Sequence, residues 1–241
     1  QIFTPVWFLR AIAYHLERVR RGEINRLIIN MPPRSLKSLM TSVAYPAFVL
    51  GHDPTARIIC ASYSSELAHK HSNDFRAVLN SPWYRSIFPG TRIGPYKDSE
   101  VEIELTARGF RLATSIGGTL TGRGGILEII DDPLKAIDAF SDVKRNAANE
   151  WLLNTAFSRL DDKVTGAIVI VMQRVHIDDL TGFVLRQPGN WTVLSLPAIA
   201  EHFETIPLGL NEVHHRHPGE VLSPEREPLH VLEEHRSLLG S

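Results

Sequence analysis

Lys37 and Ser38 stand where the sequence could hold a phosphate group. They follow the apolar run Leu27 to Ile29 and the break at Pro32-Pro33, and the residues after them have helical spacing to about Leu50. In such a strand, loop and helix, the loop amides and the helix N-terminus face the anion, the lysine neutralises it, and the hydroxyl can ligate Mg²⁺. We therefore predict that the loop binds the phosphates of a nucleotide and that Ser38 is a metal ligand.

The loop departs from the pattern G-x-x-x-x-G-K-S/T, because Met31 and Leu36 occupy the two glycine positions. A Cβ atom limits positive φ and close approach of the backbone to a ligand. Taken alone, the stretch is therefore equally compatible with an ordinary helix start. The residues that we expect to contact the nucleotide here are Pro33, Arg34, Ser35, Leu36, Lys37 and Ser38.

Two carboxylates, Asp131 and Asp132, follow a second apolar run, Leu127 to Ile130. The first is placed to hold Mg²⁺, directly or through water, and the second to position or polarise an attacking water. The alternative is that Asp-Asp-Pro only caps the next helix. Because Lys37-Ser38 also follows a strand, the pairing favours the catalytic interpretation.

Two arginines and a glutamine could complete such a site. Arginine neutralises charge that develops on a transferred phosphoryl group. Arg34 lies in the loop and could act within its own chain, whereas Arg123 lies in a glycine-rich segment that could reach a neighbouring subunit. Gln173, at the end of another apolar run, could sense the γ-phosphate. Each has a structural alternative: the arginines could bind DNA or a carboxylate, and Gln173 could be a satisfied polar residue at a strand end.

Other polar clusters favour simpler interpretations. The histidines of His214 to His217 resemble a metal site, but no cysteine or carboxylate spacing supports one, which favours a solvated loop. His176 with Asp178 and Asp179 could suggest metal-dependent hydrolysis. We instead expect Asp178 to cap a helix, with His176 as a packing or coupling residue.

Apolar runs that alternate with helical segments must position these residues. Such runs predict an α/β fold with a mostly parallel sheet covered by helices on both faces. Ligands of these sheets bind beyond the carboxyl ends of the strands, where the polar clusters at 32–38, 131–132 and 173–176 stand. The expected strands are 26–30, 57–63, 126–130, 167–172 and 191–196, with a hairpin of 101–105 and 110–114; the expected helices are 5–21, 37–50, 64–79, 141–160 and 178–186.

Composition sets broad limits on the protein. The 241 residues are 43% hydrophobic and 22% charged, with a net charge of −1, so any contact with nucleic acid must be local. One cysteine, Cys60, excludes a disulfide framework and fits a reducing compartment. We find no membrane-spanning run and no secretion signal. Gln1 in place of an initiator Met suggests an excised fragment.

Little periodicity follows Pro197. We therefore expect one large domain over 1–197 and a flanking or linker region over 198–241.

The ordered set of motifs resembles the ATPase domain of phage terminase large subunits, the motors that pack double-stranded DNA into procapsids. The resemblance implies a P-loop NTPase fold of the additional-strand, RecA-like class, which binds ATP and Mg²⁺. It covers nearly all of the chain, and its motifs are jointly specific. The matching segments are 32–38, 60–68, 117–124, 129–135, 173–180 and 217–224.

Carried over by position, the resemblance implies a role for each site residue. Arg34, Lys37 and Ser38 match the phosphate-binding Walker A loop; Asp131 matches the Mg²⁺ carboxylate of Walker B, and Asp132 the catalytic carboxylate. Gln173 and Arg174 match the coupling motif, Arg123 matches a loop arginine that acts across subunits, and Phe3 and Pro5 lie where the family contacts adenine.

The resemblance also implies partners. We expect sequence-independent contact with double-stranded DNA, a portal protein, a small terminase subunit and a homo-oligomeric ring, in the cytoplasm of a bacterial host cell and without a membrane. The family's nuclease domain has no room here, so we expect no DNA cleavage. The rivals are a helicase core, which needs a second RecA-like domain, and a nucleotide-gated DNA- or protein-binding module that binds ATP with little turnover.

Overall fold

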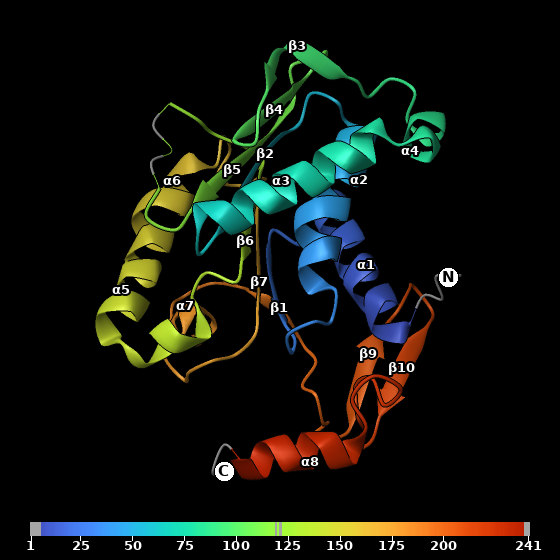
Figure 1. Ribbon diagram of the computed structural model, residues 1–241, viewed down its shortest axis with the longest axis vertical. Coiled ribbons are helices and arrows are strands. Elements are labelled where there is room, and N and C mark those ends of the chain that lie inside the picture. Colours follow the sequence, from blue (N-terminus) through green and yellow to red (C-terminus); the bar gives the residue numbers. More distant parts are fainter. Residues whose placement is uncertain (1–5, 119, 121, 239–241) are drawn as a thin grey trace.

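A central sheet organises the protein, which we describe from a computed structural model covering residues 6–118, 120 and 122–238. Phe3 and Pro5 lie outside the described residues, so the expected adenine contact stays a prediction. The sheet has eight strands in the order β3-β4-β5-β2-β6-β7-β1-β8 (Figure 1). A separate two-stranded sheet joins β9 and β10.

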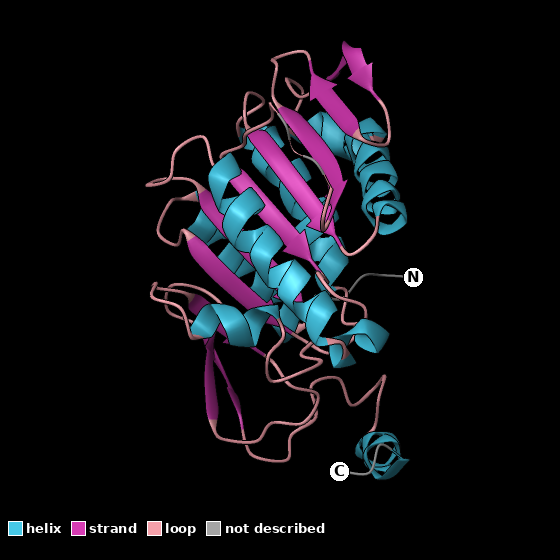
Figure 2. Cartoon of the chain, turned by 90° about the vertical axis from the view of Figure 1, so that its left-hand side faces the viewer, coloured by secondary structure: helices cyan, strands magenta, loops and turns pink. Residues whose placement is uncertain are grey.

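The core of the large sheet is parallel, as the apolar runs predicted. The parallel pairs are β5 with β2, β2 with β6, β6 with β7, β7 with β1, and β1 with β8. The inner strands β1, β2, β6 and β7 are mostly apolar and buried because helices cover both faces (Figure 2). The bounds of these strands and of β8 are β1 Arg26–Asn30, β2 Arg57–Ser62, β6 Leu127–Asp131, β7 Ala167–Met172 and β8 Thr192–Ser195.

Helices from the first third of the chain cover one face of the sheet. They are α1 (Trp7–Arg20), the π-helix η1 (Leu39–Ala44) that continues into α2 (Tyr45–His52), and α3 (Ser65–Asn80). Side chains such as Ile12, Leu50 and Phe75 from these helices share one buried cluster with Leu27, Ile58 and Ile129 from the strands. The short helix α4 (Pro82–Ile87) follows α3 and adds Tyr84 to this cluster.

The opposite face carries a second cluster. Trp151, Leu152 and Val184 pack there with strand residues such as Ile130 and Ile170. The covering elements are α5 (Asp142–Trp151), the π-helix η3 (Leu152–Ala156), α6 (Phe157–Arg159) and α7 (Leu180–Leu185), with the 3-10 helix η2 (Ala136–Phe140) before α5. The single helix expected over 141–160 is therefore present, with a π-helical turn in its second half.

The antiparallel edge of the sheet extends the predicted hairpin. β4 (Glu102–Leu105) pairs antiparallel with β5 (Phe110–Ser115), as expected. A further strand, β3 (Ile93–Asp98), pairs with β4 and was not predicted. Its sequence, IGPYKD, contains Gly and Pro and lacks an alternating pattern, so it gives no strand signal.

Regular structure continues after Pro197, contrary to the weak periodicity there. The hairpin β9 (Glu204–Pro207) and β10 (Val213–Arg216) lies beside the start of α1, and α8 (Leu229–Leu238) follows (Figure 1). The ring of His214 stacks on Trp7 with centroids 4.1 Å apart. The sequence showed little periodicity here because strands of four residues are too short to show a period. The division at 197/198 itself stays a prediction.

None of the described helices combines the length and apolar content needed to cross a membrane.

Candidate active site

The strand order brings three polar segments to one rim of the sheet. β7 lies between β1 and β6, and the register aligns Asn30 with Met172 and Asp131 with Val171. All three strands are parallel, so their carboxyl ends meet at the same edge. The loop of residues 32–38 after β1, named the phosphate loop after its predicted role, therefore stands beside the Asp pair at the end of β6 and Gln173 after β7.

Lys37 and Ser38 each contact one of the two aspartates. The Nζ atom of Lys37, whose side chain is 5% exposed, lies 3.1 Å from Oδ2 of Asp132. The hydroxyl of Ser38 donates to Oδ1 of Asp131 over 2.9 Å. Helical structure begins at Lys37, which places the N-terminus of a helix at the end of the loop. A cation, a hydroxyl and two carboxylates thus converge from two separate strands.

The phosphate loop reaches this geometry without its glycines. Arg34 and Leu36 have φ angles of 58° and 63°. The Cβ of Leu36 therefore does not prevent the left-handed conformation, although each such residue costs about 1–2 kcal/mol. The hydroxyl of Ser35 donates to the carbonyl of Pro32 over 2.8 Å and closes the turn. Strained backbone of this kind concentrates at functional sites.

Asp131 is a buried carboxylate in a polar cluster. Burial, reinforced by the neighbouring charge of Asp132, raises its pKa from 3.8 to about 7, while hydrogen bonds from Ser42 and Ser38 and the charge of Lys37 oppose the rise. Ser42 Oγ donates to Oδ2 over 2.7 Å. A divalent cation would favour the ionised form of this carboxylate, because opposite charge lowers the pKa of an acid.

Asp132 is fixed through its backbone as well as through Lys37. Its own amide donates to the carbonyl of Val171 over 2.8 Å. The amide of Gln173 donates to Oδ1 of Asp132 over 3.2 Å. Gln173 also lines a cavity of about 290 Å³, together with Pro33 of the loop and Ser195 at the end of β8. The structure therefore links Gln173 to Asp132 by a direct contact.

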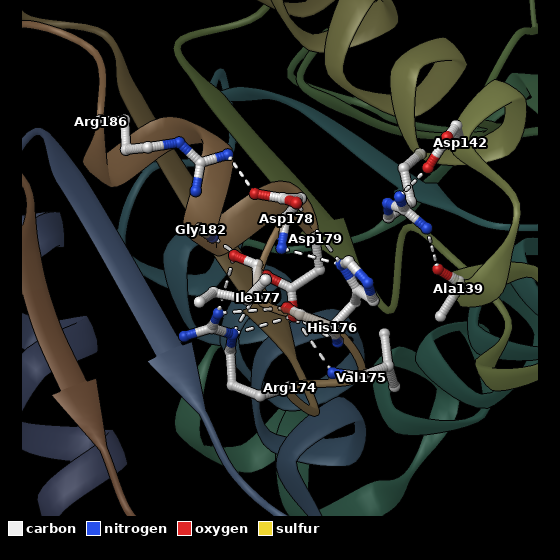
Figure 3. Close-up of polar contacts among 11 residues, drawn as sticks. Ala139, Asp142, Arg174, Val175, His176, Ile177, Asp178, Asp179, Gly182 and Arg186 are labelled. Atoms are coloured by element: carbon white, nitrogen blue, oxygen red, sulfur yellow. Dashed lines mark hydrogen bonds and ion pairs between the residues drawn. The ribbon is translucent and has the colours of Figure 1, made fainter.

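A single carboxylate organises the segment after Gln173, as Figure 3 shows. Asp179, which is 0% exposed, accepts hydrogen bonds from Arg174 Nε over 3.0 and 2.9 Å and from the amides of Val175 and Gly182 over 3.1 and 3.0 Å. The expected cap residue, Asp178, was wrong by one position: Asp179 caps α7. Asp178 instead forms an ion pair with Arg186 at 2.9 Å.

The two candidate arginines lie in different places. Arg34 is exposed and lines a cavity of about 220 Å³ with Lys37 and Ser38. Arg123 donates from Nη2 to Oε2 of Glu102 over 2.8 Å, and its guanidinium lies 5.7 Å from the centre of the Phe110 ring. The structure therefore brings Arg34 beside the Lys37 site of its own chain and holds Arg123 on the β4–β5 hairpin.

Three residues beside the site were missed by sequence reasoning. Ser42 stands four positions after Ser38 on the same helical segment, and this spacing is a signal that could have found it. His71, on α3, has Nδ1 3.5 Å from Oδ2 of Asp131, and Arg226 donates from Nη2 to the carbonyl of Pro33 over 3.3 Å. Neither has a local pattern that points to the loop.

The donor set fits a magnesium–nucleotide complex. Mg²⁺ prefers oxygen ligands, and Ser38 and Asp131 place a hydroxyl and a carboxylate together. Lys37 and the helix N-terminus supply the positive charge that phosphates need. The arrangement can hold a phosphate chain and a divalent cation beside a second carboxylate, Asp132.

Comparison with known proteins shows a likeness in fold. No protein-family model matches the sequence, and no curated protein matches it. The HK97 bacteriophage large terminase superposes with a TM-score of 0.52 at 15% identity, over 83% of this chain and 40% of that chain. The large terminase ATPase domain of Thermus phage P74-26 gives a TM-score of 0.41 at 15% identity, over 71% of this chain and 70% of that one.

The fold predicted from the sequence motifs is confirmed. The chain has an α/β fold with a mostly parallel sheet between two layers of helices, and it shares this fold with the HK97 protein. The chain spans 40% of the length of the HK97 large terminase.

Proposed function

We propose that the protein is the ATP-hydrolysing motor domain of a phage terminase large subunit, which powers translocation of double-stranded DNA into a procapsid. One observation carries the proposal. Lys37 lies 3.1 Å from Asp132, and Ser38 lies 2.9 Å from Asp131, so both halves of the expected phosphate and metal site meet at one rim. The likeness in fold to a large terminase supports the same conclusion.

Each residue has a defined task in this proposal. Loop amides and Lys37 bind the β- and γ-phosphates, and Ser38 and Asp131 hold Mg²⁺, which neutralises charge on the phosphate oxygens when bound. Asp132 orients the attacking water, because its carboxylate is anchored between Lys37 and the amide of Gln173. Gln173, fastened to Asp132, transmits the state of the γ-phosphate to the segment before α7.

The assembly belongs to the proposal too. Double-stranded DNA is bound through its backbone charge and not through base identity. A portal protein and a small terminase subunit are the further partners, and the chains act as a ring in the cytoplasm of the bacterial host. Arg34 or, across the subunit boundary, Arg123 supplies the arginine that neutralises the transferred phosphoryl group.

A second function remains in competition, favoured by Leu36. This residue puts a side chain, 45% exposed, where the loop pattern has glycine. The alternative is a nucleotide-gated DNA- or protein-binding module that binds ATP with little turnover.

Phosphate release and nucleotide binding, measured together, separate the two functions. Lys37→Ala removes the cation from the phosphate site, so we expect loss of both nucleotide binding and turnover. Asp132→Asn keeps the size of the side chain, so we expect binding to persist while turnover falls by about 10²–10⁴-fold. Glu150→Gln, at an exposed site, is the control for loss of a carboxylate.

The outcome that favours the module is equally clear. If the unmodified protein binds ATP tightly but releases no phosphate even at high protein concentration, the motor function is wrong.

A further inference from the structure

We propose that Ser42 and His71 are positioning residues for Asp131: they hold its Oδ2 atom so that Oδ1 is presented to Ser38 and to the metal. This inference rests on the proposed function, because it assigns Asp131 to a magnesium–nucleotide site.

The two oxygens of Asp131 have different neighbours. Oδ1 accepts from the Ser38 hydroxyl over 2.9 Å, on the side of the phosphate loop. Oδ2 accepts from the Ser42 hydroxyl over 2.7 Å and lies 3.5 Å from Nδ1 of His71. The terminal torsion of a free aspartate is broad and roughly two-fold, so its oxygens exchange places. The hydrogen bond from Ser42 to Oδ2, with His71 beside the same oxygen, gives the two oxygens different surroundings and favours one orientation.

His71 reaches Asp131 from a third element, α3. Its side chain is buried, and within the part of the chain that the structure describes its Nδ1 has no hydrogen-bond partner at normal distance. A buried polar nitrogen without a partner costs about 1–3 kcal/mol. Oδ2 of Asp131 lies 3.5 Å from this nitrogen, and a shift of a few tenths of an ångström closes the hydrogen bond.

The backbone around Ser42 is fixed by a proline and a buried arginine. In an α-helix the carbonyl of Ser42 would accept from residue 46, but Pro46 has no N–H. Arg111, which is 0% exposed, donates from Nη2 to this carbonyl over 3.1 Å. The π-helix η1 coincides with this interruption. The turn that carries Ser42 is therefore anchored to the sheet strand β5, independently of the phosphate loop.

Contacts of this kind act on the metal through its ligand. Groups that orient a metal-binding carboxylate change metal affinity by about 10–100-fold when removed, although they never touch the ion. Ser42 lies on η1 and His71 on α3, so two separate elements contact the same carboxylate. The expected defect is weaker metal binding with intact metal-free nucleotide binding.

Binding of Mn²⁺, as a spectroscopic substitute for Mg²⁺, tests the inference with a non-hydrolysable ATP analogue. Ser42→Ala and His71→Leu should each weaken Mn²⁺ binding by about 10–100-fold, as measured by electron paramagnetic resonance. Affinity for the analogue in the presence of a chelator should stay within about two-fold of the unmodified protein. His71→Asn, whose amide can replace the Nδ1 donor, should restore most of the Mn²⁺ affinity.

Ser72→Ala is the matched control. Ser72 is also buried on α3, directly after His71, and its hydroxyl has no partner among the described residues. We expect it to leave Mn²⁺ binding unchanged. Thermal unfolding of each variant identifies any that fail to fold. If His71→Leu does not fold, Mn²⁺ binding by Ser42→Ala, the smaller change, decides whether the inference holds.

The outcomes separate the two levels of inference. Unmodified protein that binds Mn²⁺ and analogue, with Ser42→Ala and His71→Leu within two-fold of it, overturns the positioning roles and leaves the proposed function intact. Unmodified protein that binds the analogue no better with Mn²⁺ than without it overturns both.

Discussion

Two residues of the phosphate loop store strain in the backbone. Arg34 and Leu36 are left-handed, with φ of 58° and 63°, and Asp132 on the facing strand end has φ of 43°. Such conformations persist only where the surrounding structure over-determines them. Here the hydrogen bond within the loop, the ion pair of Lys37 and the amide of Gln173 do so. The site therefore has one preferred shape before a ligand arrives.

Leu36→Gly should release part of this strain. Glycine adopts positive φ without penalty, and the Leu36 side chain is 45% exposed, so little burial is lost. Glycine also has more conformational freedom in the unfolded chain, which offsets part of the gain from released strain. We therefore expect a net rise in the free energy of unfolding of up to about 1 kcal/mol. Leu39→Gly, at a similarly exposed position within a helix, should lower it by about 1 kcal/mol. Urea unfolding of both variants checks the sign, and a loss in both would show that Leu36 is not strained.

From the sequence, only site residues at or after the ends of strands could be predicted to lie close together in space. Lys37, Ser38, Asp131 and Gln173 each come just after or at the end of an apolar run, and parallel pairing alone makes them neighbours. His71 was not predicted as a site residue because it lies in the middle of a helix, where a histidine more often packs in the core. Its approach to Asp131 depends on how α3 crosses the sheet, which no local pattern specifies.

At the level of elements, the segment between β7 and α7 depends on one buried carboxylate. Asp179 accepts from Arg174 and from backbone amides on both sides of the turn. Since Gln173 opens this segment and contacts Asp132, the same carboxylate sets where the segment stands relative to the site.

Asp179→Asn should therefore destabilise the protein by about 1–3 kcal/mol, because the new amide group turns a donor toward donors. Asp178→Asn is the matched control: this neighbour is 50% exposed, and we expect a change within about 0.5 kcal/mol. Denaturant unfolding gives the energies, and hydrogen exchange of the α7 amides locates the change. Equal effects of the two substitutions would contradict this account.

A strand buried on both faces was predicted accurately, whereas a hairpin held by its partners was missed. β7 was predicted with its observed bounds, Ala167–Met172, because a strand buried on both faces is apolar throughout. The hairpin of β9 and β10 was missed because its residues, including three histidines and two glutamates in and near its strands, are held by pairing with each other and by packing on α1. The contact on α1, between Trp7 and His214, joins residues about 200 positions apart in sequence.

At the scale of the whole molecule, a second buried acid lies on β6, three residues before Asp131. Glu128 on β6 is 1% exposed, and among the described residues neither of its carboxylate oxygens has a hydrogen-bond partner. Burial raises its pKa from 4.5 to about 8, while the charges of Arg26 and Arg159 oppose the rise. The folded state thus binds this proton more tightly than the unfolded state.

The consequence is a stability that declines with pH. A raised carboxyl pKa lowers the free energy of unfolding as pH rises from about 4.5 to about 8. Glu128→Gln should flatten this slope and stabilise the protein above pH 8, by at most about 5 kcal/mol at about 1.4 kcal/mol per pKa unit. Chemical unfolding from pH 5 to 9 measures it, with the exposed Glu150→Gln as control. An unchanged slope in Glu128→Gln would show that Glu128 is ionised throughout.

The position of Arg123 allows a test of whether the proposed turnover depends on more than one chain. Its guanidinium is paired with Glu102, and the structure places no contact between it and Lys37 or Asp132 within the described chain. If it acts on a neighbour, Arg123→Ala should reduce turnover by up to about 10³-fold at protein concentrations where chains associate, and little at high dilution. Arg34→Ala should reduce turnover equally at both. A concentration-independent effect of Arg123→Ala would exclude action across subunits.

The order of the strands fixes the distance between the two halves of the candidate site. With β7 inserted between β1 and β6, the loop and the twin carboxylates stand two strand spacings apart, about 10 Å. Backbone hydrogen bonds on both sides of β7 hold that width constant, and across it Lys37 reaches Asp132 while Ser38 reaches Asp131. A rearrangement that removed or added one strand here would leave every reactive group in the sequence and none of them within reach of another.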